Sequence, residues 1–149
     1  MKKLVPLILL ILLLATGCSK DTVLDGYNQL LNMVGKIALT GSLSLEGERE
    51  YGSDRYTGTY QAEYQDFNGT ETLFGGTGLS REEGNKLTIT CKFTADEGKA
   101  VLFFSGKDDP EVLCGEYDDW TGTVTLSGGS EYIGICGENF TGSVDLTVE

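Results

Sequence analysis

An alternation of apolar and polar residues, with a period of two, runs through most of the chain and limits its fold more than any other feature. Apolar or small residues occupy every second position, and mostly Thr, Ser, Gln, Lys or Glu stand between them. The alternation is clearest in residues 37–45, 56–64, 87–93, 123–127 and 143–148. Because successive side chains of a strand point to opposite faces, the pattern predicts antiparallel strands with one face on a core and one face in water.

Residues 101–104, Val-Leu-Phe-Phe, break this alternation and predict a strand that is covered on both faces. Shorter strands are expected in residues 70–74, 111–116 and 131–136, with turn signals between the segments. Residues 37–149 are therefore expected to form an all-β domain of about eight or nine strands. That number of strands favours an antiparallel β-sandwich with a jelly-roll-like topology.

A single helix is expected before the strands, in residues 22–36. Leu24, Tyr27, Leu31 and Val34 recur there at helical spacing. We expect this helix to cover an edge or a face of the sheet, and a helix that binds a partner is the alternative.

The N-terminus has the three-part organisation of an export signal. Lys2 and Lys3 supply positive charge, residues 4–14 are apolar apart from one proline, and small residues precede Cys18. A bilayer core needs about 20 apolar residues, so this shorter run suits a signal peptide and not a membrane span.

Residues 14–18, Leu-Ala-Thr-Gly-Cys, resemble the lipobox of bacterial lipoproteins, with Ala15 where that family favours a larger aliphatic residue. The resemblance implies that residues 1–17 are a signal peptide, removed by cleavage between Gly17 and Cys18. It also implies that the Cys18 thiol receives a diacylglyceryl lipid. The alternative is an ordinary secretory signal that leaves Cys18 as a plain thiol.

Two acyl chains hold a protein stably on a membrane. The resemblance therefore implies a chain anchored in the lipid bilayer on its exported face. That face is the outside of the cell membrane, or the outer membrane in a host with two membranes. Residues 18–21 would be the lipidated cysteine and a short tether with a reach of roughly 10 Å.

The charge and the lack of histidine exclude several classes of function. The formal net charge is −12, which repels phosphate backbones, so no nucleic-acid partner is expected. The chain has no histidine, which excludes Ser-His-Asp and Cys-His nucleophiles and His-bearing zinc sites. An extracellular protein or a glycan is the expected partner.

Two acidic segments are the candidates for a ligand or Ca²⁺ loop. Each joins carboxylates whose oxygens could ligate Ca²⁺, and the second also holds the single tryptophan of the chain. Solvated acidic turns without a ligand are the alternative, and no firm metal site or other cofactor is expected. The candidate residues are Asp108, Asp109, Glu116, Asp118, Asp119 and Trp120.

Three cysteines follow Cys18, namely Cys91, Cys114 and Cys136. Their odd number allows at most one disulfide within the chain, and the sequence does not select the pair. Cys91 shares an apolar face with its neighbours, so a buried thiol is the alternative for it.

The recurring tyrosines Tyr51, Tyr56, Tyr60 and Tyr64 are expected in the core, with a sugar-stacking surface as the alternative. Paired carboxylates could catalyse hydrolysis, but 23 acidic residues produce such pairs by chance. The pairs therefore do not indicate an active site, and no catalytic residues are expected. The sequence favours a non-catalytic structural or complex-forming subunit at the membrane. The first alternative is a carbohydrate- or Ca²⁺-dependent binding module, and a small carboxylate-dependent hydrolase is the second.

Overall fold

The described part of the chain forms one antiparallel β-sheet. A computed structural model describes residues 45–77, 81–115 and 119–149. These residues form six strands and no helix, so the all-β class is confirmed. The strands are β1 (Glu48–Tyr51), β2 (Gly58–Thr77), β3 (Lys86–Ser105), β4 (Glu111–Gly115), β5 (Asp119–Thr125) and β6 (Ser130–Val148).

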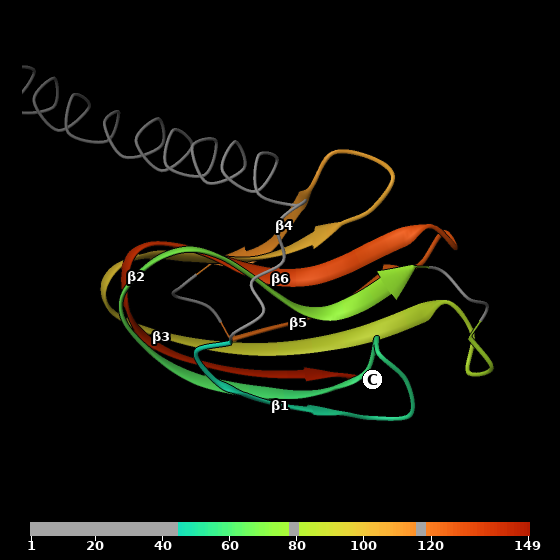
Figure 1. Cartoon of the computed structure of the whole chain (residues 1–149), viewed down its shortest axis with the longest axis horizontal. Helices are drawn as coiled ribbons and strands as arrows, with labels where there is room; N and C mark the ends of the chain where they lie inside the picture. Colours follow the sequence, from blue (N-terminus) through green and yellow to red (C-terminus); the bar gives the residue numbers. More distant parts are fainter. Residues whose placement is uncertain (1–44, 78–80, 116–118) are drawn as a thin grey trace, which may run out of the picture.

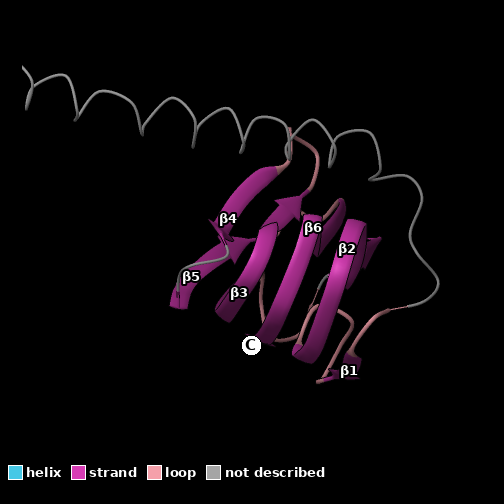
Figure 2. Ribbon diagram, turned by 90° about the vertical axis from the view of Figure 1, so that its left-hand side faces the viewer, coloured by secondary structure: helices cyan, strands magenta, loops and turns pink. Residues whose placement is uncertain are grey.

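The central strands are β2, β6 and β3, which lie side by side in Figure 2. The sheet order is β1-β2-β6-β3-β4. The remaining strand, β5, also pairs with β3. β5 pairs with the first half of β3, from Lys86 to Lys92, whereas β4 pairs with the second half, from Val101 to Phe104.

The signal segment, Cys18 and the helix expected in residues 22–36 lie outside the described residues. So does nearly all of the strand expected in residues 37–45. In the ranges that are described, no helix is long and apolar enough to cross a membrane.

The three central strands are long and bend together. β2 and β3 have 20 residues each and β6 has 19, against a usual strand length of about five or six. Figure 1 shows that all three curve back at one end of the molecule, so that the sheet folds over into two layers. The ladder between β2 and β6 has bulges between Tyr64 and Gly69, and the ladder between β3 and β6 has them between Ala95 and Lys99. Such bulges increase local bending.

Residues in the left-handed region stand at the bend in each of these strands. Asp66 of β2, Gly98 of β3 and Asn139 of β6 have φ angles of 50°, 74° and 48°. Asn and Asp tolerate this region better than other side chains do, and Gly adopts it freely. Side chains replace some of the interrupted ladder bonds, since the backbone N–H of Asn139 donates to Asn68 Oδ1 at 2.9 Å.

The bend explains why the strand count differs from the sequence prediction. We predicted about eight or nine strands, and the described residues contain six. Three pairs of expected strands are continuous, the strand expected in residues 37–45 lies almost wholly outside the described residues, and β1 was not predicted. Residues 87–93 and 101–104, for example, both belong to β3. The polar segment Asp96-Glu97-Gly98 between them is the bend of one strand and not a turn between two.

The main core lies between the two layers. Its buried residues come from both halves of the bent strands and include Tyr60, Leu73, Leu102 and Leu146. The prediction that the recurring tyrosines are core residues is confirmed for Tyr56, Tyr60 and Tyr64. It is wrong for Tyr51, which lies on the edge strand β1 and is exposed. A second, smaller cluster of Val101, Phe103 and Cys136 occupies the opposite face of the sheet. The run that begins at Val101 is thus buried on both faces through Phe103, as predicted.

We predict that Gly98→Ala destabilises the fold more than Gly84→Ala does. Both glycines have positive φ angles, 74° and 87°. A Cβ at Gly98 would lie 2.0 Å from the carbonyl oxygen of Asn139, whereas a Cβ at Gly84 would meet nothing within 4 Å. We expect a loss of about 1 kcal/mol for Gly84→Ala from backbone strain, and of at least about 2–3 kcal/mol for Gly98→Ala. Urea unfolding measures both, and equal losses would show that the close approach at the bend is unimportant.

Candidate functional site

A buried carboxyl group links the two halves of β2. The Glu71 side chain is 2% exposed, and its Oε2 accepts hydrogen bonds from the hydroxyls of Tyr60 at 2.9 Å and Tyr64 at 2.6 Å. Its Oε1 accepts a bond from the backbone N–H of Glu46 at 2.6 Å. Burial raises the pKa of both tyrosines, and so do their hydrogen bonds to Glu71. The group is closed to solvent and satisfied by the protein, so it stabilises the fold and offers no site to a ligand.

A second buried carboxyl group organises the turn between β5 and β6. Glu131 is 2% exposed and accepts bonds from the backbone N–H of Ser127 at 2.8 Å and from its hydroxyl at 2.9 Å. The backbone N–H of Gly128 donates to the same carboxyl group at 3.3 Å. The Glu131 carboxylate therefore stabilises the backbone of this turn and, like that of Glu71, is not available to a ligand.

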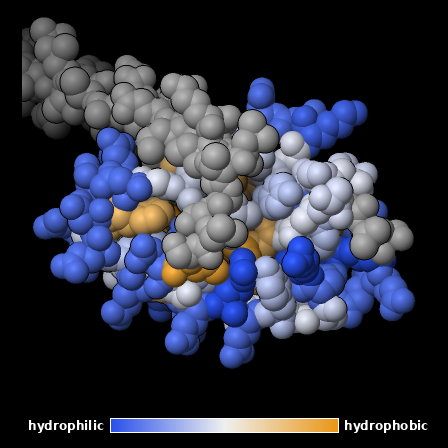
Figure 3. Space-filling view, in the orientation of Figure 1, coloured by the Kyte–Doolittle hydropathy of each residue, from blue (hydrophilic) through white to orange (hydrophobic). Residues whose placement is uncertain are grey.

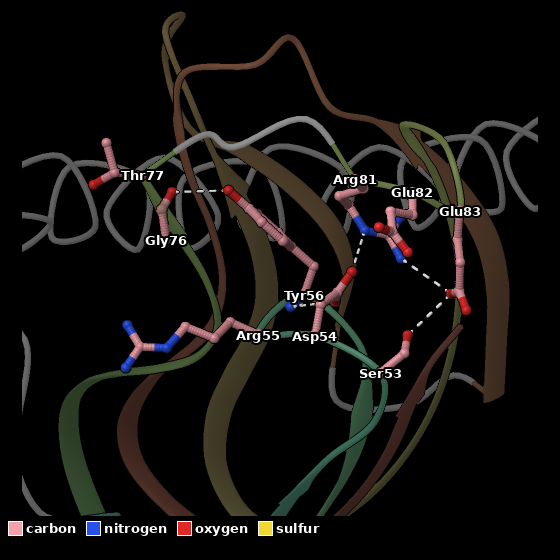
Figure 4. Close-up of a pocket in the computed structure, with 9 residues that line it drawn as sticks. All are labelled: Ser53, Asp54, Arg55, Tyr56, Gly76, Thr77, Arg81, Glu82 and Glu83. Atoms are coloured by element: carbon pink, nitrogen blue, oxygen red, sulfur yellow. Dashed lines mark hydrogen bonds and ion pairs between the residues drawn. The ribbon is translucent and has the colours of Figure 1, made fainter.

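The best-formed hollow lies where the β1–β2 turn meets the segments that follow β2 and precede β3 (Figure 4). It has a volume of about 660 Å³. Its lining combines both signs of charge with one tyrosine ring. The lining residues are Ser53, Asp54, Arg55, Tyr56, Gly76, Thr77, Arg81, Glu82 and Glu83.

Asp54 organises the β1–β2 turn from within. Its Oδ1 accepts hydrogen bonds from the backbone N–H groups of Tyr56 at 2.8 Å and Thr57 at 3.0 Å. Its Oδ2 accepts a bond from Arg81 Nε at 2.5 Å. Burial alone would raise the pKa of Asp54, but the bonds from Arg81 and Tyr56 outweigh it and hold the pKa below its ordinary value.

Arg81 is already neutralised by the protein. Its side chain is 4% exposed, and it pairs with Asp54, donates to the carbonyl of Gly84 at 2.8 Å and lies 3.7 Å from Glu83. Arg55, the other cation of the hollow, extends its guanidinium away from the remaining lining residues in Figure 4. The hollow therefore has no free positive charge directed at its centre.

The lining groups are not arranged for acid–base or nucleophilic chemistry. The Ser53 hydroxyl donates to Glu83 Oε2 at 3.0 Å, but both groups are exposed. Glu83 also lies 3.7 Å from Arg81, so its charge is partly neutralised and it is a poor base for activating Ser53. The Tyr56 hydroxyl donates to the carbonyl of Gly76 at 3.0 Å, and burial raises its pKa. The arrangement joins two connecting segments and leaves a recess with a mostly apolar lining that a small ligand could enter.

The structure does not bring the described acids of the two candidate loops together. Asp108 and Asp109 are exposed at the tip of the β3–β4 hairpin, before β4 begins. Asp119 starts β5 after β4 has ended, and it pairs with Lys92. Glu116 and Asp118 lie outside the described residues. Among those that are described, no three Asp, Glu or Cys side chains are grouped to hold a metal ion, and Ca²⁺ binding stays a prediction.

Trp120 belongs to a strand and not to a loop. It pairs with the buried Cys91 and packs half-buried against the core. Its ring also covers Gly122, because a Cβ at that position would lie only 2.1 Å from the ring. Trp120 therefore covers the inner face of β5 and is not presented as a ligand-stacking surface.

One surface escaped the sequence analysis. Thr121, Thr90, Thr147 and Thr59 are paired in register across β5, β3, β6 and β2, and so form a row over the outer face of one layer. The hydroxyl oxygens of Thr90 and Thr121 lie 3.3 Å apart. The signal was the preference for Thr at polar positions of the alternation, but only strand pairing aligns these residues.

The face drawn in Figure 3 has hydrophilic side chains around its rim and apolar patches nearer its centre. Tyr51 is the exposed large apolar residue of the described part, at 47% exposure, and the Arg49 guanidinium lies 4.5 Å from the centre of its ring.

Neither a protein-family model nor a curated protein matches this sequence.

We predict that Arg81→Met costs about 1–3 kcal/mol of stability at pH 7, because it leaves Asp54 without its charged partner. The folded-state pKa of Asp54 is lowered, so its stabilisation is present above its unfolded pKa, about 3.9, and is lost as pH falls through the lower folded value. Arg81→Met should therefore also make the loss of stability below about pH 4 shallower.

Arg55→Met is the matched control, since this arginine belongs to the same turn and its side chain is exposed. Urea unfolding between pH 2.5 and 7 measures both effects. Equal stability and an equal pH profile for the two variants would contradict the assigned role of the Arg81–Asp54 pair.

Proposed function

We propose that the chain is a membrane-anchored surface lipoprotein whose β domain acts as a non-catalytic structural or complex-forming subunit. The observation that carries the proposal is the segment Leu14-Ala15-Thr16-Gly17-Cys18 behind an apolar run of signal-peptide length. Lipid on Cys18 would hold the protein at the exported face of a membrane, at about 0.8 kcal/mol for each buried CH₂ group.

The chemistry of the domain supports a role in binding and not in catalysis. The buried carboxyl groups of Glu71 and Glu131 accept hydrogen bonds from the protein itself. In the hollow beside the β1–β2 turn, the charges of Asp54 and Arg81 neutralise each other. A hydrolase with two carboxyl groups needs one of them free to donate a proton in a cleft, and these groups are committed to the fold. We further propose that the two layers pack as a sandwich closed on one side by the bend.

The threonine row is the surface that we assign to a partner. An outer sheet face carrying Thr59, Thr90 and Thr121 is exposed and spans adjacent strands. Short hydroxyl side chains lose little conformational entropy on contact and can both donate and accept hydrogen bonds. Such a face suits an extracellular protein partner better than it suits anionic lipid headgroups, because the domain is strongly acidic.

We predict that a palmitate analogue, supplied to cells that express the full chain, labels the wild-type protein and not Cys18→Ala. Cys136→Ala is the control, because it removes another thiol that is buried in the domain. The unlabelled variant should leave the membrane fraction. Label that persists in Cys18→Ala, or a wild-type protein without label, would refute the anchor.

We predict that Thr90→Arg abolishes a discrete cross-linked adduct of the membrane-bound protein, whereas Asp109→Arg leaves it intact. Both positions are exposed and both variants introduce the same side chain, so each should change stability by less than about 0.5 kcal/mol. Cross-linking on intact cells followed by purification of the protein gives the measurement. An adduct that survives in both variants would exclude the threonine row as the partner surface.

A further inference from the structure

The sheet assigns the thiols of the domain to opposite faces. Cys91 is 0% exposed and lies on the buried face of β3, together with Leu87, Ile89 and Phe93. It stands opposite Leu146 of β6, another residue of the main core. Cys91 therefore points inward from the layer that contains the first half of β3.

Cys114 points inward from the other layer. It stands opposite Leu102 in the β3–β4 ladder, and directly opposed residues share a face of the sheet. Leu102 belongs to the main core, as does Cys114, which is 7% exposed. Leu102 follows the bend of β3 and Cys91 precedes it, so the two cysteines enter the same core from different layers. The neighbouring Cys114 thiol and burial both raise the pKa of Cys91.

Cys136 is separated from this pair by the sheet itself. It stands opposite Val101 and packs with Phe103 in the small cluster on the other face. In β3, Val101 and Leu102 are neighbours in sequence and therefore point to opposite faces. Of the three pairings that the sequence left open, Cys91 with Cys114 is the one whose two members belong to the same core cluster.

We propose that Cys91 and Cys114 are joined by a disulfide bond in the mature protein, while Cys136 remains a thiol. The proposal rests on the proposed function, because export carries the chain to a compartment where disulfides persist. The bond would connect the two layers directly, where they are otherwise linked covalently through the bent strands.

The bond forms by exchange with a disulfide-bearing donor, such as a thiol–disulfide oxidoreductase. Each of the two thiols gives up one proton and one electron as the new S–S bond forms. The two electrons and two protons convert the donor disulfide into two thiols, so the reaction balances. Both cysteines are buried in the folded protein, so we place the exchange during folding, when the donor can reach them.

The lipidated full chain, purified in detergent from membranes with its free thiols blocked, gives the first test. Peptide mapping by mass spectrometry should find Cys91 linked to Cys114, with Cys136 alkylated once the protein is denatured. A reducing agent should lower the melting temperature by roughly 5–15 °C. Cys136→Ala should keep this sensitivity, and Cys91→Ala and Cys114→Ala should each lose it. A link that involves Cys136 would overturn the pairing.

Refolding of the same reduced chain in a glutathione redox buffer separates the pairing from the location. A bond that forms on refolding but is missing from protein isolated from cells would support the pairing and count against export. No bond by either route, in a protein that still incorporates the palmitate analogue, would overturn the disulfide and leave the anchor standing. Because mapping uses the wild-type chain, the test holds even if a cysteine variant fails to fold.

Discussion

The shared bend in β2, β3 and β6 is the constraint on which the rest of the structure depends. A single flat sheet of this size would leave one apolar face in water, and folding the sheet over buries the inner faces of both halves against each other. The bend requires residues that accept positive φ angles, which Asp66, Gly98 and Asn139 supply. It also brings Glu71 back to Tyr60 and Tyr64 of the same strand, and it places Cys91 and Cys114 in one core.

The acidic residues of the domain divide into two groups with different physical roles. Glu71 and Glu131 are buried and each accepts several hydrogen bonds, which compensates for the cost of removing a polar group from water. Asp108, Asp109 and Asp119 are exposed and dispersed over the surface. A few acidic residues thus make specific contacts inside the domain, and the exposed ones give it a negative surface. A negative surface does not oppose the proposed anchoring, because the acyl chains and not the surface charge would hold the protein at the membrane.

Export and disulfide formation are linked by the redox chemistry of the compartment. A lipid anchor on the exported face would place the domain where thiols are oxidised, and the fold offers one pair of thiols to such an environment. A bond between the layers would hold the two halves of the sheet at a fixed separation. The outer face with the threonine row would then be a rigid surface, which lowers the entropy lost when a partner binds.

The sequence by itself determined the class of the fold, the inward face of the alternating strands and the burial of Tyr56, Tyr60 and Tyr64, because a period of two fixes which side chains share a face. It also contains the segment that resembles a lipobox, a pattern that is local. Only the tertiary structure decided that Asp96-Glu97-Gly98 bends one strand and does not end it, since a polar glycine-containing segment suits either outcome. The alignment of Thr90 with Thr121 and Thr147, and the placement of Cys91 and Cys114 in the same core, likewise depend on strand register and layer packing. Those are long-range relations, which no local pattern of residues specifies.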